Sequence, residues 1–327
     1  MSHEIVPLTD KHLSDAAALV AARYRSLREH APSMPSRYQD ADVILPWLSD
    51  LARQAPGVAA IHGGRLVGFL VGHVIPEFRG ERTVFSPEWA NAADLLNSRQ
   101  IYQEMYANLS GRWTANGCFT HLICMLAHDQ EGIQGWHWQG FGLIAADAVR
   151  DLRSIQETTA GIDIRQGSSQ DLDQAIRLTD ALQRHLAAAP TFLAYTHRAH
   201  AAWWEEWFAS PANALWLALE GTQAVAFMKQ EPPVEHDVSV FFRDDRSTSI
   251  TGAFTAERLR GRGIATALLN QVLGRARCQH CERCAVSLAT DVPIRDECAC
   301  GSFLDEALSA GLLWAGPSRQ QTGCLGQ

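Results

Sequence analysis

The chain has 327 residues, 46% of them hydrophobic, and its formal net charge at pH 7 is −8. This length accommodates two domains of ordinary size, and the acidic balance argues against a nucleic-acid partner, which usually meets a basic face. Since the chain has no run of about eighteen apolar residues and its first residues do not form a signal peptide, we expect a soluble cytoplasmic protein without membrane contact.

Strands and helices are expected to alternate in the first half of the chain. The clearest signal is a hairpin, in which two β-rich runs flank the turn Gly63-Gly64. In chain order, the expected elements are a strand at 5–8, helices at 13–29 and 41–53, strands at 57–61, 65–75 and 83–85, a helix at 99–115, a strand at 119–126, a short helix carrying Trp136, and a strand after Gly140-Phe141-Gly142.

The second half repeats this order from a strand at 162–165. The further elements expected are helices at 169–187 and 201–209, strands at 215–220, 224–229 and 249–255, a helix from 264, a strand at 285–289 and a helix at 303–310. Two copies of one unit of about 160 residues are the simplest account. We therefore expect two domains, 1–157 and 158–327, with the junction at 154–161.

The stretch from Ser249 to Leu269 carries the strongest chemical signal. It contains an apolar strand ending at Thr255, a loop with Gly261 and Gly263, and an amphipathic helix of about four turns. The first turn of this helix has no acidic residue, so its unpaired N–H groups and positive dipole end predict an anion site. The two glycines would let a ligand approach the main chain.

Three anion-binding loops compete for these residues. A Walker loop requires a lysine that is absent, and a dinucleotide-binding loop requires a third glycine where the chain has Thr266, although Glu282 follows at the spacing of a ribose-binding acid. The pattern Arg/Gln-x-x-Gly-x-Gly/Ala fits from Arg258 or from Arg260, and we prefer Arg260 because Ala265 then lies in the first helical turn. A glycine-rich turn without a ligand is the alternative.

The run GAFTAERLRGRGIATALL resembles the acyl-CoA-binding motif of the GNAT N-acyltransferase superfamily. The resemblance implies an α/β (α+β) fold with two GNAT-like domains, each a mixed, mostly antiparallel sheet flanked by helices, and acetyl-CoA as cosubstrate. By motif position, the strand residues that would bind the pantetheine arm are Ala253, Phe254 and Thr255. The loop residues that would hold the pyrophosphate are Gly261, Arg262, Gly263, Ile264, Ala265 and Thr266, with Arg260 as the arginine of the motif.

The first domain resembles the family only in its last third, in the run HLICMLAHDQEGIQGWHWQGFG. It has no Arg-x-x-Gly-x-Gly/Ala after its fourth strand, so we expect it to be degenerate for CoA and to act as a structural element or to shape the acceptor site. This tandem layout is similar to that of mycothiol synthases. For His121, His128 and His137, we expect core or surface positions, with a catalytic role as the alternative.

The catalytic groups that the resemblance implies are incomplete. A tyrosine on the last helix often protonates the departing thiolate in this family, and the chain has Ala307 at that position. A thiol with a pKa of about 8.5 leaves without such an acid. The candidates for the base are Glu235, His236 and Asp237, whose alternative role is solvated surface charge. From Leu288 onward the resemblance decays, and both sequence divergence and a shifted reading frame would explain this.

Tryptophans and cysteines cluster in two segments. The helix at 201–209 carries Trp203, Trp204, Trp207 and Phe208, for which we expect core packing, with an aromatic wall for an apolar or aromatic acceptor as the alternative. The six cysteines after residue 277 are Cys278, Cys281, Cys284, Cys298, Cys300 and Cys324. They lack the paired CxxC spacing of a structural zinc site, so we expect free thiols and no metal.

Together these features predict an acetyl-CoA-dependent N-acyltransferase that acts on an amine of a small molecule or a protein. The competing hypothesis is a catalytically weak or inactive acyl-CoA-binding or regulatory protein. The expected partners are acyl-CoA and an unidentified amine, and a homodimer is compatible with the sequence.

Overall fold

The computed structural model describes residues 3–78, 80–153, 155, 161–189, 201–233, 239–289 and 307–315. Contacts between Cα atoms divide the chain into two compact units, which are described separately. Unit 1 comprises Met1–Ala146 and Leu308–Gln327, and unit 2 comprises Asp147–Ala307. Within the described residues, no helix is long and apolar enough to cross a membrane.

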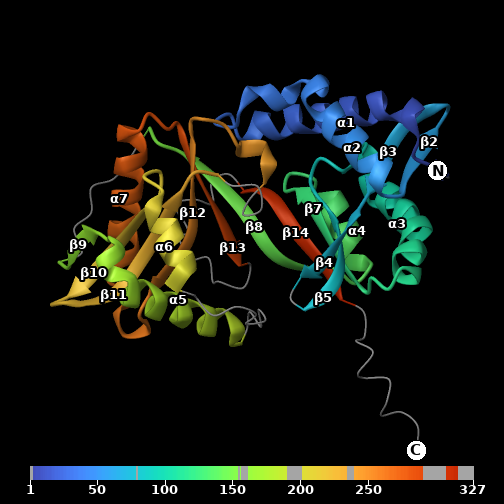
Figure 1. Ribbon diagram of the computed structural model, residues 1–327. Coiled ribbons are helices and arrows are strands. Elements are labelled where there is room, and N and C mark those ends of the chain that lie inside the picture. Colours follow the sequence, from blue (N-terminus) through green and yellow to red (C-terminus); the bar gives the residue numbers. More distant parts are fainter. Residues whose placement is uncertain are drawn as a thin grey trace, which may run out of the picture. The chain divides into compact units, whose positions relative to one another are not determined.

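Unit 1 contains two sheets and four α-helices among the described residues (Figure 1). The helices are α1 (Asp10–His30), α2 (Ala41–Gln54), α3 (Ser98–Ala115) and α4 (Gln130–Trp138). The first sheet, in the order β1-β2-β3-β6, consists of Glu4–Pro7, Gly57–His62, Arg65–Val71 and Asn91–Ala93. The second contains β4 (His73–Phe78), β5 (Glu81–Ser86), β7 (Thr120–Leu126) and β14 (Ala307–Ala315), and β5 and β7 pair in parallel.

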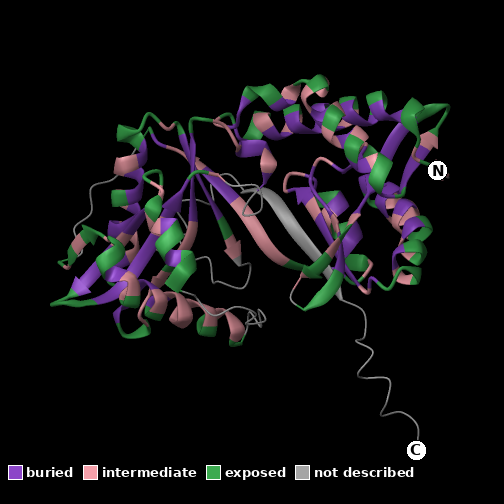
Figure 2. Ribbon diagram, in the orientation of Figure 1, coloured by how far each residue is buried: buried purple, intermediate pink, exposed green. Residues whose placement is uncertain are grey.

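The core of unit 1 is rich in aromatic side chains from α3, α4 and the strands. Trp136 is completely buried, and its ring centroid lies 4.7 Å from that of Phe141 and 5.5 Å from that of Tyr102. The rings of Trp136 and Phe141 pack edge-on, which suits aromatic rings because the positive ring edge faces a negative π face. Figure 2 shows the purple, buried side of α3 and the exposed residues on its other side, which is the pattern of an amphipathic helix.

Unit 2 contains one curved row of strands with helices on both faces (Figure 1). The order of its strands is β13-β12-β11-β10-β9, and only β12 and β13 are parallel. The bounds of these strands are Asp163–Gln166 for β9, Ala214–Glu220 for β10, Gln223–Glu231 for β11, Ser247–Thr255 for β12 and Arg283–Ala289 for β13. Strand β8 (Gly142–Asp151) crosses the division between the units.

The two faces of the unit 2 sheet are covered by different helices. Helix α7 (Ile264–Cys278) packs on one face through Leu268 and Val272, which meet Met228 and Ile250. Helices α5 (Leu172–Ala187) and α6 (Ala201–Ala209) pack on the other face around Phe227. Alternation along β11 therefore sends Phe227, Lys229 and Glu231 toward the α5/α6 face and leaves Met228 facing α7.

Most elements match the predicted ones, and the fold class of mixed sheets with flanking helices is confirmed. The helix predicted at 303–310 is wrong for Ala307–Ala310, because these residues begin β14 and pair antiparallel with β7 from Ser309↔Leu126 to Ala315↔Thr120. Gly311 lies in the middle of this segment and disfavours a helix, and ladder pairing satisfies the backbone. Contacts place this strand in unit 1, whereas residues to 327 were assigned to the second domain.

The strand predicted at 65–75 is interrupted. It separates at Gly72 into β3 and β4, which lie in different sheets. A Cβ at Gly72 would lie 2.6 Å from Val84 Cγ1. The glycine therefore allows the backbone to pass close to β5 where the chain changes sheets.

Candidate functional site

The loop between β12 and α7 has the backbone of a tight, exposed turn. After Thr255 it forms a 3-10 turn at Glu257–Leu259, and α7 begins at Ile264. Gly261 and Gly263 have φ angles of 75° and 76°, a region that costs other residues about 1–2 kcal/mol. A Cβ at either glycine would meet no atom within 4 Å. Backbone conformation therefore requires glycine here, and the surface next to both residues is open.

The start of α7 is uncapped. Its N-cap, Gly263, has no side chain, and the first turn contains no acidic residue. In the described part of the chain, no acceptor takes the N–H groups of Ile264, Ala265 or Thr266, and the first bond is from Ala267 N–H to the Gly263 C=O at 2.9 Å. These N–H groups and the helix dipole present positive partial charge to the exterior, which suits an anion.

The three arginines near this loop have different partners. Arg258 forms an ion pair with Glu220 at 2.5 Å, and its hydrogen bond lowers the pKa of the Glu220 carboxyl. Arg260 donates from Nε to the Thr255 C=O at 3.1 Å and stacks over the Phe254 ring at 5.8 Å. Among the described residues, neither Arg260 nor Arg262 forms an ion pair. The arginine of the preferred motif register thus keeps its charge available for a ligand.

Strands β12 and β13 are paired at one end and separate at the other. Their parallel register runs from Ser247↔Arg283 to Ile250↔Val286, and β12 then continues to Thr255. On its other side, β12 stays paired with β11 up to Ala226↔Thr255, with a register shift beyond Lys229 that leaves Thr251 as a bulge residue. Among the described residues, nothing pairs with the β13 side of the segment from Thr251 to Thr255, so this part of β12 offers an open strand edge directly before the β12–α7 loop.

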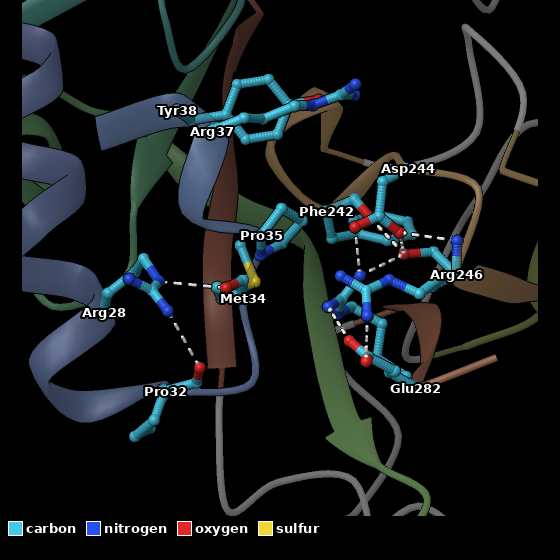
Figure 3. Close-up of polar contacts among 12 residues, drawn as sticks. Arg28, Pro32, Met34, Pro35, Arg37, Tyr38, Phe242, Asp244, Arg246 and Glu282 are labelled. Carbon is cyan, nitrogen blue, oxygen red and sulfur yellow. Dashed lines mark hydrogen bonds and ion pairs between the residues drawn. The ribbon is translucent and has the colours of Figure 1, made fainter. Parts of the chain in front are cut away.

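The paired end of these strands is held by an ion network around the buried Arg283, and Figure 3 shows its members Asp244, Arg246 and Glu282. Arg283, only 4% exposed, lies 2.5 Å from Asp244, donates to Ser247 Oγ at 3.1 Å and pairs with Glu282 at 3.0 Å. Arg246 also pairs with Glu282. Because these groups join the first residues of β12 and β13, they fix the strands together at the end opposite the opening.

A buried carboxylate that the sequence analysis missed lies beside the bulge. Glu231, on β11, accepts a hydrogen bond from Trp207 Nε1 at 2.7 Å and one from the Thr251 hydroxyl, and it pairs with Lys229 Nζ at 3.1 Å. No motif marks Glu231. The alternation along β11 could have indicated that it faces α6, but its partner Trp207 is 24 residues away in the sequence.

The tryptophan-rich helix α6 contains two core tryptophans and one that is about half exposed. Trp204 and Trp207 are 1% and 6% exposed and belong to the core, whereas Trp203 is 47% exposed. The Lys229 ammonium lies 4.6 Å from the Trp203 ring centroid and 5.7 Å from that of Trp207. Two indole faces and one carboxylate thus surround a single cation on the α5/α6 face of the sheet.

Several predicted candidates lie apart from this site or outside the description. Glu235, His236 and Asp237 fall outside the described residues. Ala307, at the position expected for a tyrosine, is the first residue of β14. Cys278 is exposed and Cys284 is buried, with burial raising the pKa of its thiol. Within the described ranges, no three His, Cys, Asp or Glu residues could hold a metal ion.

Two of the three candidate histidines of unit 1 have hydrogen-bond partners. His121 is completely buried between the Tyr106 hydroxyl at 2.8 Å and the Cys118 C=O at 3.2 Å, and burial lowers its pKa to about 4. Burial likewise lowers the pKa of His128 to about 4. His137 lies 3.0 Å from the Phe141 C=O. The contacts of His121 and His137 favour the predicted core and surface roles, whereas both ring nitrogens of His128 are buried without a hydrogen-bond partner among the described residues.

The segment of unit 1 that corresponds to the β12–α7 loop lacks glycines and has a carboxylate at its helix start. Strand β5 ends at Ser86, where its parallel pairing with β7 also ends, and α3 begins at Ser98 after a 3-10 turn. The Ser98 hydroxyl donates to Asp129 at 2.8 Å, and Asp129 pairs with Arg23 at 3.1 Å. Residues 87–97 contain no glycine, and a carboxylate of the chain itself lies at the helix start.

Comparisons with known proteins agree with this geometry. Residues 180–296, within unit 2, match the model of the acetyltransferase (GNAT) family. A GCN5-related N-acetyltransferase from Sphaerobacter thermophilus is 12% identical with a TM-score of 0.60, and the alignment covers 95% of both chains. A tandem GNAT protein from the clavulanic acid biosynthesis pathway is 13% identical with a TM-score of 0.50, covering 97% of this chain and all of that one. The curated proteins contain no match.

The β12–α7 loop lies within the segment that matches the acetyltransferase (GNAT) family, whose members are acyltransferases. This chain carries a GNAT acetyltransferase domain within unit 2, and its fold as a whole is similar to that of tandem GNAT proteins.

Proposed function

We propose that the chain is an N-acetyltransferase that transfers an acetyl group from acetyl-CoA to an amine. The observation that carries the proposal is the uncapped start of α7, with Gly261 and Gly263 in the left-handed region and free N–H groups at Ile264, Ala265 and Thr266. Such a helix start binds phosphate without further groups. Arg260 and Arg262 add positive charge at the same exposed loop.

The pantetheine arm of the cosubstrate would run along the open edge of β12. A strand edge binds an extended amide chain through its own N–H and C=O groups. Ala253, Phe254 and Thr255 lie on this edge beyond the last parallel pair with β13. The reactive thioester would then lie near Thr251, where positioning beside an amine supplies much of the rate.

A second candidate function is acyl-CoA binding without turnover. The observation that favours it is Ala307, which stands where the family's thiolate-protonating tyrosine was sought and which begins a strand. In that case the chain would act as an acyl-CoA-responsive regulator.

Two measurements on the purified chain decide between these functions. Calorimetry with acetyl-CoA tests binding, and thiol release in the presence of a panel of primary amines tests turnover. Binding with amine-dependent thiol release supports the transferase, and binding without it supports the regulator. If acetyl-CoA does not bind, both functions fail.

A further inference from the structure

We propose that Lys229 is an acyl acceptor of the protein itself, so that the domain acetylates this lysine when acetyl-CoA is bound. The inference rests on the proposed function for its acyl donor. It adds a modification site that the family assignment does not contain.

The sequence makes Lys229 unusual. Of the 28 lysines and arginines in the chain, only Lys11 and Lys229 are lysines. An arginine would stack on the indoles and pair with a carboxylate at least as well as a lysine does. An arginine cannot, however, release a proton and act as a nucleophile. The one property that distinguishes lysine at this position is therefore an amine that can be acylated.

The surroundings of Lys229 supply a proton acceptor. Its side chain is 13% exposed, and its ammonium lies 3.1 Å from the Glu231 carboxylate, whose side chain is 9% exposed. Within the described residues, Glu231 is the only acidic group paired with Lys229. A buried carboxylate at hydrogen-bond distance from an ammonium has the geometry of a general base.

The same carboxylate connects the amine to the open strand edge. Glu231 Oε1 accepts from the Thr251 hydroxyl as well as from Lys229, so one oxygen atom separates the ammonium from the bulge residue of β12. Lys229 is also the register partner of Gly252, which carries no side chain. A Cβ at Gly252 would lie 3.8 Å from Lys229 Cβ. Gly252 therefore places no side chain of its own between Lys229 and the opening, although the Phe227 ring lies nearby, with Cε2 3.4 Å from the position of such a Cβ.

The chemical step balances with acyl-CoA as the only co-reactant. Glu231 takes a proton from the Lys229 ammonium, and the amine nitrogen forms a bond to the thioester carbonyl carbon. The C–S bond breaks, and the CoA thiolate takes up the second proton that the nitrogen loses as the amide forms. Glu231 then releases its proton to solvent. The product is a neutral acetyl-lysine between Trp203 and Trp207.

The test is to incubate the chain with acetyl-CoA in the absence of any amine and to map acetylation by peptide mass spectrometry. Lys11 is exposed and reports spontaneous acetylation by the thioester, so it is an internal control. Because a positioned base typically contributes 100-fold or more, we expect Lys229 to be acetylated roughly 100-fold faster than Lys11. Loss of the ammonium beside Trp203 should also change the tryptophan emission with the same time course.

Three variants make the result specific. Glu231→Gln should slow acetylation of Lys229 by at least about tenfold and leave Lys11 unchanged. In Lys229→Arg, which keeps the positive charge, acetylation should fall to the level of Lys11 alone. Gly263→Asp, which removes the anion site, should lower the rate of acetylation of Lys229 to that of Lys11. If the parent chain binds acetyl-CoA but acetylates Lys229 no faster than Lys11, this inference is wrong and the proposed function stands. If acetyl-CoA does not bind, the proposed function fails with it.

Discussion

Each unit contains a helix between two parallel strands, α3 between β5 and β7 in unit 1 and α7 between β12 and β13 in unit 2. At α3, the first residue donates to Asp129, a buried carboxylate of the chain that is paired with Arg23. At α7, no acid of the described chain lies in the first turn, and the N–H groups are free. The same topological position thus holds the protein's own anion in one unit and is open to an external one in the other.

The strands before these helices also differ, with a paired end in unit 1 and an open edge in unit 2. Strand β5 ends together with its parallel pairing to β7, whereas β12 continues for five residues, 251–255, beyond its last pair with β13. An open strand edge and an open helix start are both needed to bind a long cosubstrate with an anionic end. The comparison therefore teaches that two helices at similar topological positions can differ in whether the described chain leaves the helix start and the neighbouring strand edge open.

The largest effect is expected from Gly263→Asp, which would give α7 an anion of its own. At about 4 Å and an effective dielectric constant of about 20, each like-charge contact with a phosphate costs roughly 4 kcal/mol. Binding of acetyl-CoA should weaken about 1000-fold. The left-handed backbone adds a folding cost of about 1–2 kcal/mol, which Gly263→Ala reports separately. Calorimetry with both variants checks this, and equal affinity of Gly263→Asp and the parent would show that the loop is only a turn.

Removal of Asp129 tests the closed helix start of unit 1. Asp129→Ala would leave the Arg23 guanidinium, whose side chain is 6% exposed, without its carboxylate. Breaking a buried ion pair in this way destabilises by about 3 kcal/mol or more. Denaturant unfolding of the variant measures the loss, with the exposed neighbour Glu131→Ala as the control. If both variants unfold like the parent, Asp129 does not hold this helix start.

The stability of unit 1 should depend on pH through His121. Because burial lowers its pKa to about 4, the unfolded chain binds the proton first. The free energy of unfolding is therefore full above pH about 6.5 and falls by up to about 3 kcal/mol as the pH decreases to about 4. His121→Gln should flatten this dependence, leaving the part due to His128. Unfolding curves at several pH values measure this dependence. If the free energy of unfolding of His121→Gln varies with pH as strongly as that of the parent, His121 is not its source.

The smallest effect concerns the arginines of the open loop. Arg260→Ala should weaken acetyl-CoA binding by about 1 kcal/mol and reduce its salt dependence, because the lost contact is a solvent-exposed charge. Arg258→Ala is the matched control, since Arg258 is already paired with Glu220. Titrations at two ionic strengths compare the two variants. A larger loss for Arg258→Ala would favour the other register of the motif.

Much of this fold could be predicted from periodicity and turn residues. The helix at 201–209 and the first strand of the hairpin around Gly63-Gly64 have the predicted bounds to within a residue. The glycine loop before α7 and the start of that helix could be predicted because the glycines, the missing acids and the helix pattern are all local in sequence. Local signals of this kind do not depend on the rest of the fold.

The features that escaped prediction depend on distant partners. Ala307–Ala310 form a strand because β7, almost two hundred residues earlier, offers a ladder partner. Glu231 is recognisable as a site residue only when Trp207 and Thr251 are seen to donate to it. The chain division after Ala146 likewise follows from contacts and not from composition.

The most direct test of the difference between the two helix starts is the number of CoA molecules bound by one chain. Isothermal titration of the full chain with CoA should give a single site, and Gly263→Asp should remove it while Asp129→Ala, under conditions where it stays folded, should not. Two sites per chain in the parent, or one site that survives Gly263→Asp, would contradict the account.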